Sequence, residues 1–152
     1  LRPEAYTERT RCRLTYARDM VRVEYFPYRV RPVHRLQLVV RDNLDYRYKR
    51  ADRRVLDEAF ALRGQADDVL IVRHGLLTDT SIANIALWDG CEWHTPARPL
   101  LEGTQRRRLL DTGQIKETDI PAASLGSYRH IRLFNALIPF GEVELPVSQV
   151  LY

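Results

Sequence analysis

Lysine is scarce in this chain, and its two lysines are the first candidates for chemistry. Among 24 basic residues only Lys49 and Lys116 are lysines, so arginine stands where most proteins also use lysine. A guanidinium group is never a free nucleophile, whereas the amine of a lysine whose pKa is lowered can attack a carbonyl group. Lys49 ends a polar segment, residues 45–49, that also carries two tyrosines. It could therefore serve amine chemistry, although a general bias towards arginine would also explain two surviving lysines.

Two more polar segments contain residues that packing alone does not explain. Residues 77–84 are predicted to form a polar turn between two apolar strands, and the turn contains Asp79. Residues 99–106 place Gly103 and a threonine at the start of a helix, where free backbone N–H groups can bind an anion. Each segment is weak evidence by itself. Asp79 could equally cap a turn, and Asn84, between apolar neighbours, is predicted to be a buried structural amide.

The elements that position these segments form an α+β pattern in which strands outnumber helices. Alternating or continuous apolar runs predict the strands, and turn residues separate them. The best helix has an apolar stripe at helical spacing and ends near Gly64. Strands are expected at residues 12–17, 21–26, 36–40, 69–72, 82–88, 92–94, 131–137 and 147–151, and helices at 50–63, 103–110 and 121–125.

Composition limits the class of protein. A length of 152 residues with 45% hydrophobic and 29% charged residues is typical of a globular domain. No apolar run reaches the roughly 18 residues that a membrane span needs, so no membrane partner is expected. The net charge of +4 comes from dispersed arginines, which disfavours nucleic-acid binding, and residues 106–108 are predicted to be a helix face with one packing arginine. Two cysteines and four histidines show no metal-ligand spacing, so no metal and a cytoplasmic location are expected.

The polar segments occur in an order that resembles one enzyme family. The matching motifs are Lys49, Leu77-Thr78-Asp79-x-x-x-x-Asn84, Thr95-Pro96, Leu100-Leu101-x-Gly103-x-x-Arg106 and Asn135-Ala136-Leu137-x-Pro139. Their order resembles that of the class IV aminotransferases, a family that holds branched-chain and D-amino-acid aminotransferases together with aminodeoxychorismate lyase. The spacing of 30 residues from Lys49 to Asp79 (79 − 49) also resembles the family's spacing between its lysine and its acidic residue.

The resemblance implies that the cofactor is pyridoxal 5'-phosphate and that Lys49 is the catalytic Schiff-base lysine. In the family an acidic residue keeps the pyridine nitrogen protonated, so that the ring accepts electrons. The matching residue here is Asp79, whose side chain is shorter than the glutamate of most members.

The resemblance also implies how the cofactor phosphate is held. In the family it sits on backbone N–H groups of two turns. By position these groups belong to Ile82 and Ala83 in the first turn, and to Thr104 and Gln105 at the helix start. Aminotransferases often have threonine at the position of Gln105. Asn135 occupies the last loop, near the phosphate or the substrate.

The implied fold is the larger C-terminal domain of the class IV aminotransferase, or D-amino-acid aminotransferase-like, fold. Residues 41–152 are expected to form this cofactor-binding domain, and residues 1–40 a remnant of the smaller N-terminal domain. The opening strand and His-x-x-Arg region of that smaller domain are not found. The chain is therefore expected to be a truncated piece or a reduced family member.

Residues 135–139 resemble the corresponding loop of aminodeoxychorismate lyases more than the Gly-Thr or Thr-Thr pair of aminotransferases. The expected function is therefore lyase-like, releasing pyruvate from aminodeoxychorismate and leaving 4-aminobenzoate. An aminotransferase for a branched-chain or D-amino acid is the first alternative. The second is a catalytically inactive member that acts as a dimeric binding protein. Because the family's sites lie near a dimer interface, a homodimer with a small-molecule, amino-acid-like substrate is expected.

Overall fold

The computed structural model describes residues 5–18, 20–46, 48 and 52–152. The chain divides into two compact units, Leu1–Arg31 and Pro32–Tyr152. The functional domains expected at residues 1–40 and 41–152 stay a prediction, since a division into compact units does not assign cofactor binding.

The smaller unit contains an antiparallel hairpin of β1 (Thr10–Ala17) and β2 (Met20–Pro27). Arg11 lies opposite Phe26 in the register, and its guanidinium group is 5.0 Å from the centroid of the Phe26 ring. The two strands expected at residues 12–17 and 21–26 are therefore confirmed.

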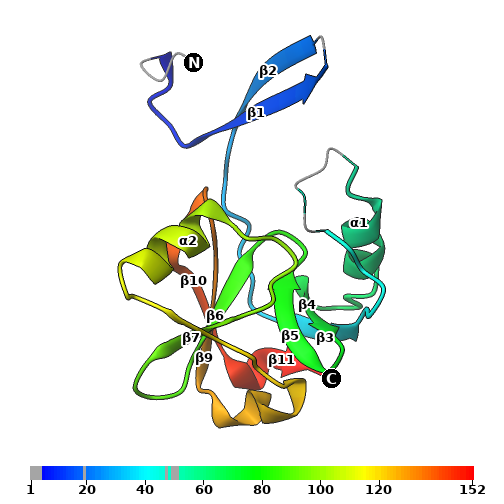
Figure 1. Ribbon diagram of the computed structural model, residues 1–152, viewed down its shortest axis with the longest axis vertical. Coiled ribbons are helices and arrows are strands. Elements are labelled where there is room, and N and C mark those ends of the chain that lie inside the picture. The colour runs from blue at the N-terminus through cyan, green and yellow to red at the C-terminus, as the bar shows by residue number, and fades with distance from the viewer. Residues whose placement is uncertain (1–4, 19, 47, 49–51) are drawn as a thin grey trace. The chain divides into compact units, whose positions relative to one another are not determined.

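The larger unit is built, among the described residues, on a branched nine-stranded sheet with helices packed against it (Figure 1). Its strands are β3 (Leu36–Val40), β4 (Asp68–Arg73), β5 (Leu76–Thr80), β6 (Asn84–Trp88), β7 (Trp93–Pro96), β8 (Lys116–Thr118), β9 (His130–Asn135), β10 (Ile138–Pro146) and β11 (Val150–Leu151). Its helices are α1 (Arg54–Ala61), α2 (Thr104–Asp111) and the short 3-10 helices η2 (Ala122–Ser127) and η3 (Val147–Gln149). The main path runs β10-β9-β6-β5-β4-β3-β11, while β7 pairs with β6 and β8 pairs with β7. The pairs β3–β4, β3–β11 and β7–β8 are parallel, and the others are antiparallel.

The sheet branches along β6. One edge of this strand pairs with β9 along all of its length. The other edge is shared, because Asn84 pairs with Asp79 of β5, whereas Leu87 and Trp88 pair with β7. β5 therefore pairs with the start of this edge of β6, and β7 pairs with its end.

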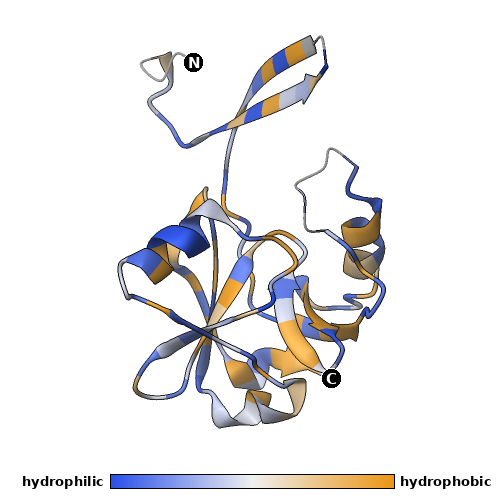
Figure 2. Cartoon of the chain, in the orientation of Figure 1, coloured by the Kyte–Doolittle hydropathy of each residue, from blue (hydrophilic) through white to orange (hydrophobic). Residues whose placement is uncertain are grey.

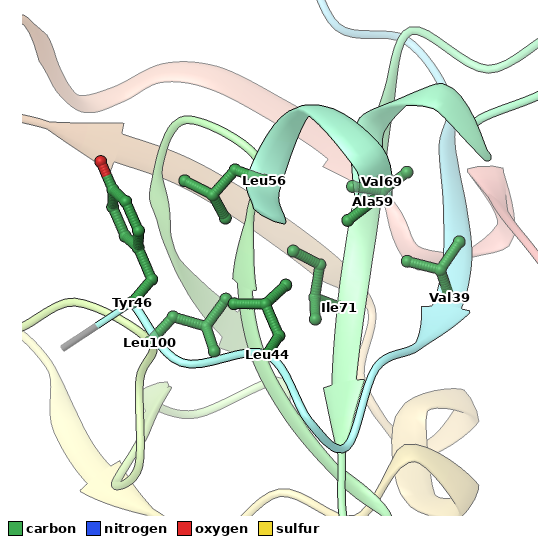
Figure 3. Packing of buried hydrophobic residues seen from close by; sticks show 8 residues of the cluster. All are labelled: Val39, Leu44, Tyr46, Leu56, Ala59, Val69, Ile71 and Leu100. Atoms are coloured by element: carbon green, nitrogen blue, oxygen red, sulfur yellow. The ribbon is translucent and has the colours of Figure 1, made fainter. Parts of the chain in front are cut away.

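Helix α1 covers β4 because one of its faces is apolar. Leu56 and Ala59 are its buried residues. They belong to a cluster formed by Val39, Leu44, Tyr46, Leu56, Ala59, Val69, Ile71 and Leu100 (Figure 3). Tyr46, from the segment that precedes the helix, and Leu100, from the loop before α2, therefore share one core with the strands.

Helix α2 packs on β9 through a second core. Leu109 is buried there with Ala86, Ile115 and Phe134. Much of α2 is hydrophilic in Figure 2, and its buried residues are Arg106 and Leu109. None of the helices formed by the described residues is both long and apolar enough to cross a membrane.

The α+β organisation and the strands expected at residues 36–40 and 69–72 are confirmed. The polar turn expected at residues 77–84 is wrong for its first half, because β5 extends to Thr80 and the turn contains only residues 81–83. The helix expected at residues 50–63 is α1, which begins at Arg54, while residues 50 and 51 lie outside the described residues. β10 was not predicted, since most of its residues are not buried and its apolar pattern is sparse.

Candidate functional site

Asp79 is buried in β5, which lies between β4 and β6 in the sheet. Only 4% of its surface is exposed, and its neighbours Thr78 and Thr80 are also buried. The hydroxyl of Thr78 donates to the carbonyl oxygen of Ile71 at 2.8 Å, which satisfies a polar group inside the sheet. The interpretation of Asp79 as a simple turn cap is therefore wrong.

Two donors from different segments hold the Asp79 carboxylate. Asn84 Nδ2 donates to Oδ1 at 2.9 Å, and the backbone N–H of Leu101 donates to Oδ2 at 3.0 Å. Asn84 Nδ2 also donates to the carbonyl oxygen of Leu101 at 2.8 Å. We call Asp79, Asn84 and Leu101 the carboxylate network. It joins β5, β6 and the loop before α2, and it confirms that Asn84 is a buried amide.

Burial raises the pKa of Asp79 to about 6, because removal from water penalises the charged carboxylate. The hydrogen bonds from Asn84 and from the backbone of Leu101, and the positive charge of Arg106, lower the pKa and oppose this effect. The carboxyl group is therefore mostly ionised at pH 7 although it is buried. Buried groups that titrate near neutrality are concentrated at functional sites.

The turn between β5 and β6 is organised by Thr80. The backbone N–H groups of Ile82 and Ala83 donate to its Oγ1 at 3.3 and 3.1 Å. The backbone N–H of Thr80 in turn donates to the carbonyl oxygen of Ala83 at 2.9 Å. Ile82 and Ala83, both predicted to bind phosphate, thus lie together in one tight turn beside a hydroxyl group.

Asn135, at the end of β9, lies against the same turn. Its Nδ2 donates to the carbonyl oxygen of Ile82 at 3.0 Å. Its Oδ1 accepts from the backbone N–H groups of Leu137 and Ile138 at 2.8 and 3.0 Å. The structure therefore brings Asn135 and Ile82 together, although 53 positions separate them along the chain.

The start of α2 lies beside the carboxylate network. Gly103 is the N-cap residue, no side chain of the described part of the chain caps the helix, and its first turn contains no acidic residue. The N–H groups of Thr104 and Gln105, in the first turn, have no acceptor within the helix. A Cβ on Gly103 would come within 2.2 Å of Asn84 Oδ1, so the helix start and Asn84 are in close contact. A helix N-terminus with free N–H groups favours an anion.

Lys49 lies outside the described residues, but residues on both sides of it are described. Before it, Tyr46 belongs to the same buried cluster as Leu100, which directly precedes Leu101 of the carboxylate network. After it, Arg53 Nη2 donates to the carbonyl oxygen of Ser81 in the turn between β5 and β6, at 2.8 Å. The chain on either side of Lys49 is thus attached to the two loops that adjoin Asp79.

Leu101 occurs in the motif before α2, but neither its bond to Asp79 nor the contact of Arg53 with this site is evident from the sequence. A backbone N–H group has no side-chain signature, so the bond from Leu101 to Asp79 is invisible before folding. Arg53 stands next to Arg54, and their residue type does not distinguish them. Arg54 instead pairs with exposed Asp52 on the surface, with 2.6 Å between Nη2 and Oδ2.

One arginine of residues 106–108 packs in the interior, as predicted. Arg106 is only 5% exposed, and its Nη2 donates to the carbonyl oxygen of Pro96 at 2.8 Å and to Glu117 Oε2 at 3.0 Å. Arg107 is exposed and pairs with Asp111 within the helix. Arg106 therefore packs in the interior and forms polar contacts with Pro96 and Glu117.

Comparison with known proteins gives the family. Residues 7–145 match the family described as amino-transferase class IV. The chain belongs to this family. A protein of Haemophilus influenzae with no assigned function is 36% identical over 127 residues, which cover 84% of this chain and 68% of that protein. The resemblance seen in the motifs is therefore confirmed.

Solved structures of relatives share the fold. A candidate 4-amino-4-deoxychorismate lyase from Haemophilus somnus is 36% identical, with a TM-score of 0.81 over 85% of this chain and 66% of that one. A candidate amino-acid aminotransferase from Mesorhizobium loti is 28% identical, with a TM-score of 0.76 over 90% and 72%. An aminotransferase from Brucella abortus, bound to the cofactor pyridoxal phosphate, shares the fold at 16% identity and a TM-score of 0.61 over 84% and 50%. The chain thus spans about two-thirds of the length of its more similar relatives.

Proposed function

We propose that this chain is the cofactor-binding part of a pyridoxal-phosphate-dependent enzyme, attached to its cofactor through Lys49. The proposal rests on three features that lie close together: the buried Asp79 carboxylate, the uncapped start of α2 and the segments that flank Lys49. When bound, pyridoxal phosphate would supply an electron sink for chemistry at the carbon that bears the substrate amine.

Asp79 fits the role of holding the pyridine nitrogen in its protonated form. Each carboxylate oxygen has two acceptor positions, four in all, whereas three groups of the described residues, Asn84 and the backbone N–H groups of Leu100 and Leu101, interact with them. Acceptor capacity therefore remains for a ring N–H. A positive ring nitrogen would also favour the charged form of Asp79, and by linkage Asp79 would keep that nitrogen protonated.

The two turns fit a phosphate group unequally. The N–H groups of Thr104 and Gln105 at the start of α2 have no intrahelical acceptor, so they would be the principal donors. The N–H groups of Ile82 and Ala83 already donate to Thr80 Oγ1, at 3.3 and 3.1 Å, so they would have to share these bonds with a phosphate, and only the bond from Ile82 is long. Asn135 supports this turn through the carbonyl oxygen of Ile82, which leaves the N–H groups to other acceptors.

The properties of Lys116 support Lys49 as the reactive lysine. Lys116 lies on β8, exposed, and its ammonium group pairs with Glu92. The hydrogen bond and charge of Glu92 raise the pKa of Lys116, so its amine stays protonated and is not a nucleophile. Of the two lysines, Lys49 is therefore the one we assign to cofactor attachment and to proton transfer during the reaction.

The test is an absorbance spectrum with added pyridoxal phosphate, followed by borohydride reduction and peptide mass analysis. We expect a band near the visible edge and a reduced phosphopyridoxyl group on Lys49. Lys116→Ala is the matched control and should keep both signals, whereas Lys49→Ala should lose both. A modification of Lys116 alone, or equal modification of both lysines, would contradict the proposal.

The reaction that we favour is an aminodeoxychorismate lyase reaction. The 36% identical relative of known structure is a candidate for this activity, and residues 135–139 resemble the corresponding loop of such lyases. In that reaction Lys49 would accept and return the proton while the substrate loses pyruvate and becomes 4-aminobenzoate. Supplying aminodeoxychorismate should yield both products in equal amounts.

Amino transfer is the second candidate, because the Mesorhizobium loti relative is a candidate aminotransferase. Transfer of an amino group from a branched-chain or D-amino acid to 2-oxoglutarate, without 4-aminobenzoate formation, would replace the lyase assignment. The further alternative is a catalytically inactive family member that acts as a dimeric binding protein, and failure of the full-length protein to bind the cofactor would favour it. We also propose a homodimer, which light scattering tests directly.

A further inference from the structure

The orientation of the Asn84 amide is fixed by what surrounds it. Its Nδ2 faces Asp79 Oδ1 at 2.9 Å and the carbonyl oxygen of Leu101 at 2.8 Å. Both partners are acceptors, so only the NH₂ end of the amide can face them. A 180° flip would set the amide oxygen against two other oxygens, and at a buried position water does not replace the two lost bonds.

With the NH₂ end fixed, the amide oxygen points at Gly103. A Cβ on Gly103 would lie 2.2 Å from Asn84 Oδ1 and 3.4 Å from Asn84 Cγ. The backbone of Gly103, with φ −69° and ψ 146°, is extended and suits any residue. Position 103 therefore requires glycine because Asn84 leaves no room for a Cβ atom. The backbone conformation of this residue does not itself require glycine.

We propose that Asn84 is a positioning residue for the Asp79 carboxylate, and that Gly103 is needed because it alone lets the Asn84 amide keep both donor bonds. The two residues join the carboxylate to the first turn of α2. The consequence for cofactor binding rests on the proposed function, because Asp79 and that helix start would contact opposite ends of pyridoxal phosphate. The positioning of Asp79 does not depend on it.

Among the described residues, the groups that influence Asp79 are few enough to separate. Arg106, from α2, is the charged group of this part of the chain that acts on it, and the backbone N–H groups of Leu100 and Leu101 act from the preceding loop. Asn84, from β6, provides the side-chain hydrogen bond, and this bond favours the charged carboxylate. Loss of a hydrogen bond to a charged group should raise the pKa of Asp79 by about one to two units.

The experiment is a carbon-13 NMR titration of the Asp79 carboxyl group in the chain without cofactor. Asp79→Asn assigns the resonance by its disappearance. Asn84→Ala should raise the titration midpoint by about one to two pH units, and Gly103→Ala should raise it in the same direction because its methyl group displaces the amide. Gly126→Ala is the matched control, since a Cβ there meets nothing within 4 Å and its backbone is ordinary. An unchanged midpoint in Asn84→Ala would overturn the proposal.

A double-mutant cycle tests the link between the two residues. In the Asn84→Ala background the space beside Gly103 is open, so adding Gly103→Ala should shift the midpoint no further. Equal and additive shifts would show that Gly103→Ala acts by another route and would overturn the part assigned to Gly103. Thermal unfolding of each variant shows which are folded, and Gly103→Ala keeps the test possible if Asn84→Ala does not fold.

The same variants separate this inference from the proposed function. Shifted midpoints without a pyridoxal-phosphate band in the unmodified chain would support the positioning role and count against the proposed cofactor. A pyridoxal-phosphate band in the unmodified chain together with unshifted midpoints would support the proposed cofactor and contradict the positioning role of Asn84. If both hold, Asn84→Ala and Gly103→Ala should weaken cofactor binding most near pH 7, and less at high pH where Asp79 is ionised again.

Discussion

Arg53 Nη2 lies 2.8 Å from the carbonyl oxygen of Ser81, and this bond joins residues that are 28 positions apart. Ser81 belongs to the turn that carries Ile82 and Ala83. Arg53 directly precedes α1, so the bond ties the entry to that helix to the turn between β5 and β6. The neighbouring Arg54 instead pairs with Asp52 on the surface.

Arg53→Ala should weaken cofactor binding about five-fold, which corresponds to roughly 1 kcal/mol for a partly exposed charge-assisted hydrogen bond. Without this bond the segment that follows Lys49 loses its attachment to the turn, so more order has to be gained on binding. Titration of the absorbance band with pyridoxal phosphate measures the effect. Arg54→Ala removes the same charge next to it and should leave the affinity within two-fold (~0.4 kcal/mol) of the unmodified chain. Equal losses in the two variants would mean that net charge, and not the Ser81 bond, matters.

The contribution of Asp79 to the stability of the chain should fall as the pH rises through its titration. Its pKa is about 6 in the folded chain and 3.8 for an ordinary aspartate, so the folded state binds more protons between these values. The free energy of unfolding contributed by this group is therefore highest at or below pH 4, decreases between pH 4 and 6, and is lower by about 3 kcal/mol above that window.

Other carboxyl groups titrate in the same range, so the measurement is a difference. Asp79→Asn removes the titrating group. Its NH₂ group would face one of the two donors, Asn84 Nδ2 or the Leu101 N–H, and the resulting loss of stability does not depend on pH. Urea unfolding of both proteins from pH 4 to 8 should show that the unmodified chain loses stability relative to Asp79→Asn as the pH rises. A constant difference would mean that the folded pKa of Asp79 is ordinary.

Asp79 illustrates what the sequence can and cannot predict. The order and spacing of the motifs identify it as a candidate, but its place inside a strand was not predicted. Leu-Leu-Thr-Asp-Thr looks like a turn because polar side chains normally avoid a sheet interior. Here the acceptor for Thr78 is the carbonyl oxygen of Ile71 and the donors for Asp79 come from Asn84 and Leu101, so the polar groups are satisfied by segments that meet only in the fold.

The strands with continuous or alternating apolar residues were predictable, whereas β10 was not. β4 is buried along nearly its whole length, and its hydrophobic run is visible in the sequence. β10 pairs with β9 but buries only scattered residues, so it lacks the alternation that would reveal it. The assignments of Lys49 and of the phosphate-binding N–H groups remain predictions, because they depend on a bound molecule.

Asn135 offers a way to separate the turn that follows β9 from the turn between β5 and β6. Asn135→Asp keeps the acceptor for the N–H groups of Leu137 and Ile138 but loses the donor to the carbonyl oxygen of Ile82. Asn135→Ala loses both. We expect cofactor affinity to fall in both variants, and stability to fall by about 1 kcal/mol more in Asn135→Ala. Unchanged affinity in Asn135→Asp, measured by the same absorbance titration, would show that the bond to Ile82 does not support binding.

Arg106→Leu should destabilise the chain by about 2 kcal/mol, because a buried guanidinium group and its bond to the buried Pro96 carbonyl are lost. The estimate is below that for a fully buried ion pair, since Glu117 is 58% exposed and regains water. The variant should also raise the pKa of Asp79, because the charge of Arg106 lowers it. Arg107→Leu, on the exposed face of the same helix, should change the free energy of unfolding by less than about 0.5 kcal/mol and leave the Asp79 titration unchanged. Urea unfolding and the NMR titration together decide the outcome: a loss of stability without a shift of the Asp79 midpoint would restrict Arg106 to packing.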